Sequence, residues 1–130
     1  MLESRTLSIA IRRPCRDVYE CIWRPESFPK WASGLSQSPL EKVGETWTAE
    51  GPAGVVRIRF TEHNSFGVMD HYVDVGRGPE VYVPLRVVAN AEGTEVLLTL
   101  FRQPGMSGQQ FLADVEWATR DLTALKALLE

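Results

Sequence analysis

The adjacent residues Asp70 and His71 are candidates for chemistry, because a carboxylate and an imidazole are common proton donors and acceptors in enzymes. They lie in GVMDHYVDV, residues 67–75, which otherwise has the composition of a β-strand. Neighbouring residues of a strand point to opposite faces of a sheet, so only one of the two faces a core.

The cost of removing charge from water decides which residue faces inward. If Asp70 faced the core, Asp74 would be buried on the same face, whereas the face of His71 carries Met69 and Val73. Burying an ionised carboxylate is costly, while an imidazole can be neutral at pH 7. The pattern therefore predicts that His71 points inward and Asp70 outward.

Three roles for His71 are open at this point. It can be a core histidine whose ring nitrogens bond to neighbouring protein groups. It can be a polar anchor that orients a ligand in an apolar pocket. It can also be a general acid or base acting on an aromatic or β-keto substrate, which requires an orienting partner that the sequence does not name. His71 is the one catalytic candidate.

Metal, cofactor and nucleic-acid sites are not expected. His63 and His71 have no further ligand residue at the spacing of a metal site. The sequence has no glycine-rich phosphate loop and no serine nucleophile motif. The net charge of −3 and the isoelectric point of about 5.4 do not suit a phosphate backbone.

Cys15 and Cys21 are expected to be free thiols. They lie six residues apart in a predicted helix, a rise of about 9 Å, which is too long for a disulfide. The first residues lack the pattern of a signal peptide, and no stretch approaches about eighteen consecutive apolar residues. We therefore expect a cytoplasmic protein without a membrane span.

The chain of 130 residues is expected to form one domain, residues 1–130. Alternating apolar residues predict a first strand over 6–11, and prolines then bracket two short helices before residue 34. Turn residues divide the following chain into strand-length runs. These strands are expected near 35–43, 45–50, 55–63, 67–75, 80–90 and 94–102.

A long amphipathic helix is predicted at the end of the chain. Ser107 and Gln110 have the spacing of an N-terminal capping box. An apolar stripe follows at Phe111, Val115, Ala118, Leu122, Leu125 and Leu129. The predicted fold class is α+β: a curved seven-stranded antiparallel sheet wraps around the C-terminal helix, with two short helices between the first two strands.

This order of elements resembles the START-like (SRPBCC) superfamily, the helix-grip fold of plant pollen allergens, lipid-transfer domains and polyketide cyclases. The segments that carry the resemblance are SIAIRRPCRDVYECIW, FPKWASG, the strand meander and FLADVEWATRDLTALKALLE. FGVMDHYV, EVYVPLRVV and EVLLTLFRQPGM resemble in particular a bacterial group named polyketide cyclase or dehydratase. The resemblance implies an apolar ligand held between the sheet and the long helix.

The alternating faces of the strands fit such a chamber. Val56, Ile58 and Phe60, for example, share one face, and Arg57 and Arg59 the other. The residues expected to line the chamber are Trp31 near its mouth, Trp47, Phe60, Met69, His71, Leu85, Leu100, Phe111 and Val115.

The leading hypothesis is binding of a small apolar or aromatic ligand, lipid-like or polyketide-like, by a monomer or homodimer. One alternative is an enzyme of the polyketide cyclase or dehydratase type that uses His71 as acid or base. The other is a protein-interaction module without a ligand.

Overall fold

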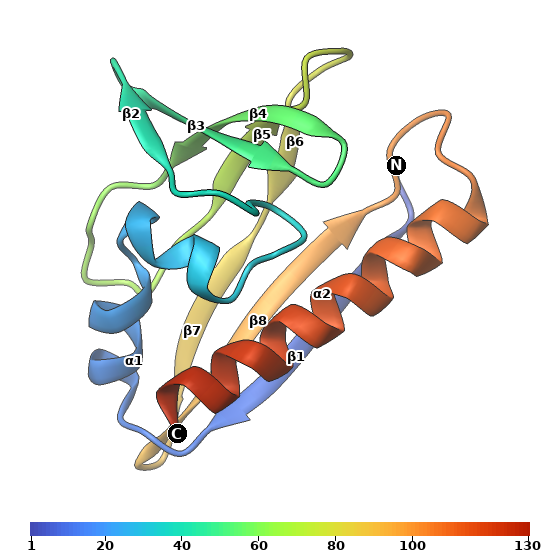
Figure 1. Ribbon diagram of the computed structural model, residues 1–130. Coiled ribbons are helices and arrows are strands. Elements are labelled where there is room, and N and C mark those ends of the chain that lie inside the picture. Colours follow the sequence, from blue (N-terminus) through green and yellow to red (C-terminus); the bar gives the residue numbers. More distant parts are fainter.

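The computed structural model describes residues 1–130 and confirms the predicted α+β class with a long C-terminal helix (Figure 1). The elements are β1 (Ser4–Ile11), α1 (Cys15–Ile22), the 3-10 helix η1 (Pro25–Lys30), β2 (Glu41–Val43), β3 (Thr46–Gly51), β4 (Gly54–Phe60), β5 (His71–Asp74), β6 (Val81–Val83), β7 (Leu85–Asn90), β8 (Gly93–Phe101) and α2 (Gly108–Leu129). The two short helices lie between the first two strands, as predicted.

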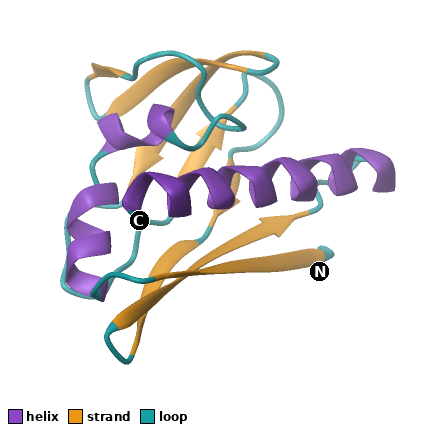
Figure 2. Ribbon diagram, turned by 60° about the horizontal axis from the view of Figure 1, so that its bottom comes forward, coloured by secondary structure: helices purple, strands orange, loops and turns teal.

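The strands form two antiparallel sheets, with the orders β1-β8-β7 and β2-β3-β4-β5-β6. Helix α2 lies along one face of the three-stranded sheet, and the five-stranded sheet rises beside it (Figure 2). We call the faces turned toward α2 the inner face and the opposite faces the outer face. None of the helices combines the length and the apolar character that a bilayer-spanning helix needs.

The prediction of one seven-stranded sheet is wrong, and Pro84 is the reason. The expected strand 80–90 is split into β6 and β7 at this proline, which has no N–H to give to a neighbouring strand. The Pro84 carbonyl still accepts a bond from the Thr99 N–H at 3.0 Å. The chain therefore bends at Pro84, so that β6 belongs to the five-stranded sheet and β7 to the three-stranded sheet.

Two further strands are shorter than predicted. The expected strand 35–43 is reduced to β2, because Ser36 and Ser38 hold the segment before it in a turn: the Ser36 hydroxyl donates to the Ser38 carbonyl at 2.6 Å. The expected strand 67–75 is reduced to β5, although the Met69 N–H donates to the Leu85 carbonyl at 2.7 Å.

The predicted strand parity and the amphipathic helix are confirmed. On β4, Val56 and Ile58 are buried and Arg57 is exposed. The Ser107 hydroxyl accepts the Gln110 N–H at 3.0 Å, as the capping box predicts. The apolar stripe of α2 is buried at every predicted position: Phe111, Val115, Ala118, Leu122, Leu125 and Leu129. Both cysteines are free.

Replacement of Gly67 by alanine is expected to lower the free energy of unfolding by about 2 kcal/mol or more. Gly67 has a φ of +70°, and a Cβ there would lie 2.7 Å from the Val87 carbonyl oxygen. Gly76→Ala is the matched control, since its φ is +89° but nothing lies within 4 Å of the added Cβ. Chemical denaturation of both variants separates the clash from the backbone strain. Equal losses would show that the approach to Val87 is unimportant.

Candidate functional site

Four rings meet on the inner face and form an aromatic cluster: Phe28, Trp31, Phe60 and His71. The register of the sheet pairs Phe60 of β4 with His71 of β5, and their ring centroids are 5.7 Å apart. Phe28 of η1 lies 5.5 Å from His71 in an edge-on arrangement and 5.3 Å from Trp31. His71 therefore points inward, as predicted, and is only 4% exposed.

The helix η1 brings Phe28 and Trp31 to the same side of the cluster. Phe28 lies within η1, and Trp31 is the residue directly after it, whose N–H donates to the Phe28 carbonyl at 3.1 Å. Phe28 is fully buried and touches all three other rings of the cluster. Phe28 was not among the predicted site residues, although its position three residues before Trp31, at the end of a predicted short helix, is the signal that could have placed both rings together.

The hydrogen bond of His71 defines which ring nitrogen carries the proton. Nδ1 lies 3.2 Å from the Met69 carbonyl oxygen, which can only accept, so Nδ1 donates. Nε2 then has a lone pair, and no protein group bonds to it. Burial lowers the pKa of His71 to about 4, although the Met69 carbonyl and Asp70 act in the opposite direction. The imidazole is therefore neutral at pH 7.

Trp31 supplies a second polar atom in the cluster. Its side chain was expected near a mouth but is only 4% exposed. The indole Nε1 is buried and has no hydrogen-bond partner. An indole N–H can only donate, so the cluster holds one unpaired donor on Trp31 and one unpaired acceptor on His71.

The two halves of α2 differ in their contacts with the main hydrophobic cluster. The main hydrophobic cluster includes α2 residues only from Ala118 onward. Phe111 and Val115 are buried but lie outside that cluster. The predicted lining residues Trp47, Phe60 and Leu100 are half-buried and pack against its edge, whereas Met69 and Leu85 lie within it. The predicted lining residues thus divide into an edge group and a core group.

Asp70 lies on the outer face, as predicted, but is not solvated as an outward carboxylate would be. It is 8% exposed, because its oxygens accept bonds from the Tyr82 hydroxyl at 2.6 Å, the Leu85 N–H at 3.0 Å and the Arg86 guanidinium at 2.9 Å. Burial alone would raise the pKa of Asp70, but these bonds together lower it. Asp70 thus satisfies the N–H of the residue that follows Pro84 and holds the bend between the sheets.

A second buried carboxylate, Asp121 of α2, fastens the loop that follows η1. Asp121 accepts bonds from the Ser33 hydroxyl at 2.7 Å and the Gly34 N–H at 2.9 Å. The indole N–H of Trp117 donates to the Ser33 hydroxyl at 2.8 Å. Burial raises the pKa of Asp121, and the hydrogen bonds from Ser33 and Gly34 oppose the rise. The loop that begins at Trp31 is therefore tied to the middle of α2.

Asp121→Ala is expected to release this loop and to lower the free energy of unfolding by about 1–2 kcal/mol, because the Ser33 and Gly34 donors lose their acceptor. Amide hydrogen exchange at residues 32–36 should accelerate more than the global stability change explains. The control is Asp114→Ala, which removes another α2 carboxylate whose hydrogen-bond partner is the Gln110 side chain. Unchanged exchange at 32–36 would show that Asp121 does not hold the loop.

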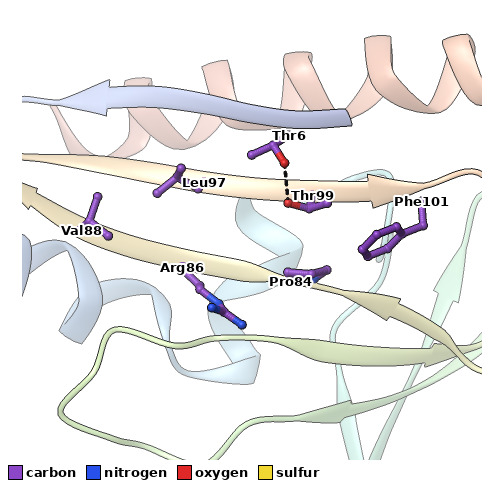
Figure 3. Close-up of a pocket in the computed structure, with 7 residues that line it drawn as sticks. All are labelled: Thr6, Pro84, Arg86, Val88, Leu97, Thr99 and Phe101. Carbon is purple, nitrogen blue, oxygen red and sulfur yellow. Dashed lines mark hydrogen bonds between the residues drawn. The ribbon is translucent and has the colours of Figure 1, made fainter. Parts of the chain in front are cut away.

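Two open grooves lie elsewhere on the surface. One, of about 340 Å³, lies on the outer face of the three-stranded sheet and is lined by Thr6, Pro84, Arg86, Val88, Leu97, Thr99 and Phe101 (Figure 3). The other, of about 800 Å³, lies between α1, the loop 63–67 and β7. None of the nine predicted lining residues borders either groove.

Comparisons with known proteins address the fold. No model of a known protein family matches the sequence, and no curated protein matches it. Among solved structures, a START superfamily protein from Mycobacterium smegmatis superposes with a TM-score of 0.70 at 8% identity, covering 97% of this chain and 96% of that one. The chain has a START-like fold.

Other structures share this START-like architecture. The Aha1 dimer from Colwellia psychrerythraea matches with a TM-score of 0.76 at 15% identity, over 99% of this chain and 97% of that one. DynU16, a protein of the dynemicin biosynthetic locus, matches with a TM-score of 0.70 at 19% identity, over 97% of this chain and 46% of that one. At such identities the likeness extends to the fold alone.

Proposed function

We propose that this START-like chain binds a small apolar or aromatic molecule, lipid-like or polyketide-like, between the inner face of its sheets and the first half of α2. The observation that carries the proposal is the packing on this side of the molecule. Phe111 and Val115 are buried outside the main hydrophobic cluster, and the apolar residues Trp47, Phe60 and Leu100 are only half-buried. Apolar residues around a few polar groups are typical of a small-molecule site.

The environment of His71 favours binding over proton transfer. A general base works best when its pKa lies near the operating pH, and the pKa of His71 is lowered to about 4. Its orienting partner is the Met69 carbonyl rather than a carboxylate that would stabilise the protonated ring. We therefore assign His71 to ligand binding and not to a cyclase or dehydratase reaction.

The test is to fill the space with a side chain. Val83 of β6 lies on the inner face, pairs with His71 and is half-buried, so Val83→Trp places an indole where the ligand is proposed to lie. Val88→Trp adds the same group on the outer face, where Val88 is 48% exposed. Binding of the uncharged anilinonaphthalene dye N-phenyl-1-naphthylamine is measured by fluorescence titration, with the melting temperature recorded for each protein.

We expect Val83→Trp to abolish dye binding with little loss of stability, and Val88→Trp to bind like the wild type. If no space exists on the inner face, Val83→Trp is an overpacked core variant and loses about 1–3 kcal/mol of stability. If Val83→Trp loses stability and Val88→Trp abolishes dye binding, the proposed site is wrong.

A further inference from the structure

The proposed site contains two polar atoms that the protein leaves unpaired. Nε2 of His71 is an acceptor, because Nδ1 donates to the Met69 carbonyl at 3.2 Å. Nε1 of Trp31 is a buried donor without a partner. Both side chains are 4% exposed, and both rings contact Phe28, at 5.5 and 5.3 Å. The buried, unpaired N–H of Trp31 costs free energy that a ligand group can recover, and Nε2 of His71 is left free to accept a bond from the same ligand.

The aromatic cluster carries no charge of its own. The carboxylate nearest in sequence, Asp70, lies on the outer face and is bound by Tyr82 and Arg86. The inner-face registers do include two cations, Arg5 opposite Leu100 and Lys42 opposite Trp47, but both are exposed on edge strands. A carboxylate next to His71 would therefore be desolvated without a cationic partner, which is strongly unfavourable.

We infer that the ligand is a neutral molecule with an aromatic body and a hydroxyl group, whose O–H donates to Nε2 of His71 and whose oxygen faces the N–H of Trp31. A hydroxyl is the simplest group that is at once donor and acceptor. The rings of Phe28 and Phe60 beside His71 suit an aromatic body, because aromatic pairs gain from edge-on and offset contacts. This inference rests on the proposed function.

The test compares three probes of similar shape at pH 7: β-naphthol, naphthalene and β-naphthoate. Titrations follow the displacement of the anilinonaphthalene dye from the wild type, from His71→Phe and from His63→Gln. His71→Phe keeps a ring in the cluster and removes Nε2. His63→Gln is the control, because His63 is paired with Glu20 at 2.7 Å, away from the cluster.

In the wild type we expect β-naphthol to bind about tenfold more tightly than naphthalene, and β-naphthoate to bind most weakly. His71→Phe should remove the preference for β-naphthol while naphthalene still binds, and His63→Gln should keep it. Trp31→Phe should reduce the preference without abolishing it, since the bond to His71 remains.

The outcomes separate this inference from the proposed function. Equal binding of naphthalene and β-naphthol to the wild type, or tightest binding of β-naphthoate, would overturn the hydroxyl inference and leave apolar binding intact. A preference that persists in His71→Phe would also overturn it. If none of the probes binds, or if Val83→Trp binds them like the wild type, both the inference and the proposed site are wrong.

Discussion

Asp70→Ala is expected to lower the free energy of unfolding by about 3 kcal/mol. The substitution leaves the buried Leu85 N–H without an acceptor and removes the partner of both the Tyr82 hydroxyl and the Arg86 guanidinium. An unpaired buried donor costs about 1–3 kcal/mol, and bonds to a charged group contribute more than neutral ones. Because Arg86 is half-exposed, its share is reduced by solvent. Denaturant unfolding monitored by circular dichroism measures the loss.

The matched control is Glu80→Gln, which breaks the ion pair between Arg59 and Glu80 at 2.9 Å on the same outer face. Both of these side chains are well exposed, so stability should hardly change. The structure predicts a large loss for Asp70→Ala and almost none for Glu80→Gln. Similar losses would show that Asp70 is an ordinary surface residue and that the Pro84 bend does not need it.

His71 is expected to make the protein less stable as the pH falls from 6.5 to 4. In the folded state the pKa of His71 is lowered to about 4 by burial, against the ordinary value of 6.5. Between these values the unfolded chain binds a proton that the folded chain does not, so acid favours unfolding. Stability is fully present above pH 6.5 and declines by about 1.4 kcal/mol per pH unit, about 3 kcal/mol in total.

His71→Leu isolates this contribution, because the variant has no imidazole to protonate. Burial raises the pKa of Asp121, so protonation of this carboxylate stabilises the folded state as the pH falls. This effect is the same in both proteins and cancels in the difference between their stabilities. Stability measured by urea unfolding at several pH values should fall more steeply for the wild type and for His63→Gln than for His71→Leu. Parallel curves for wild type and His71→Leu would contradict a buried neutral His71.

Much of this fold could be predicted because periodicity reports which face of an element is buried. The stripe from Phe111 to Leu129 required a long helix against a sheet, and the alternation around Ile58 fixed its inner face. The effect of Pro84 was harder to predict. A proline within a strand is compatible with an edge, a bulge or a bend, and only the bond from the Leu85 N–H to Asp70 decides among them.

The candidate site could be predicted in part. The cost of desolvating a carboxylate correctly predicted that His71 points inward. Whether its ring nitrogens are paired depends on the local backbone, which the alternation of apolar and polar residues does not describe. The sequence pattern placed Asp70 on the outer face with Tyr82 and Arg86. An outward carboxylate is ordinarily exposed, so the bonds that bury Asp70 against these two residues were not predicted. Asp121 lies beside the apolar stripe of α2, and its partners, Ser33 and Gly34, are distant in sequence.

A crystal structure of the protein with β-naphthol tests the central claim, that this START-like chain binds its ligand on the inner face. We expect the naphthyl ring between Trp47, Leu100 and the first half of α2, with its hydroxyl within hydrogen-bond distance of Nε2 of His71. Naphthol bound only in the outer-face groove at Arg86, or in the groove beside His63, with the inner face closed, would contradict it.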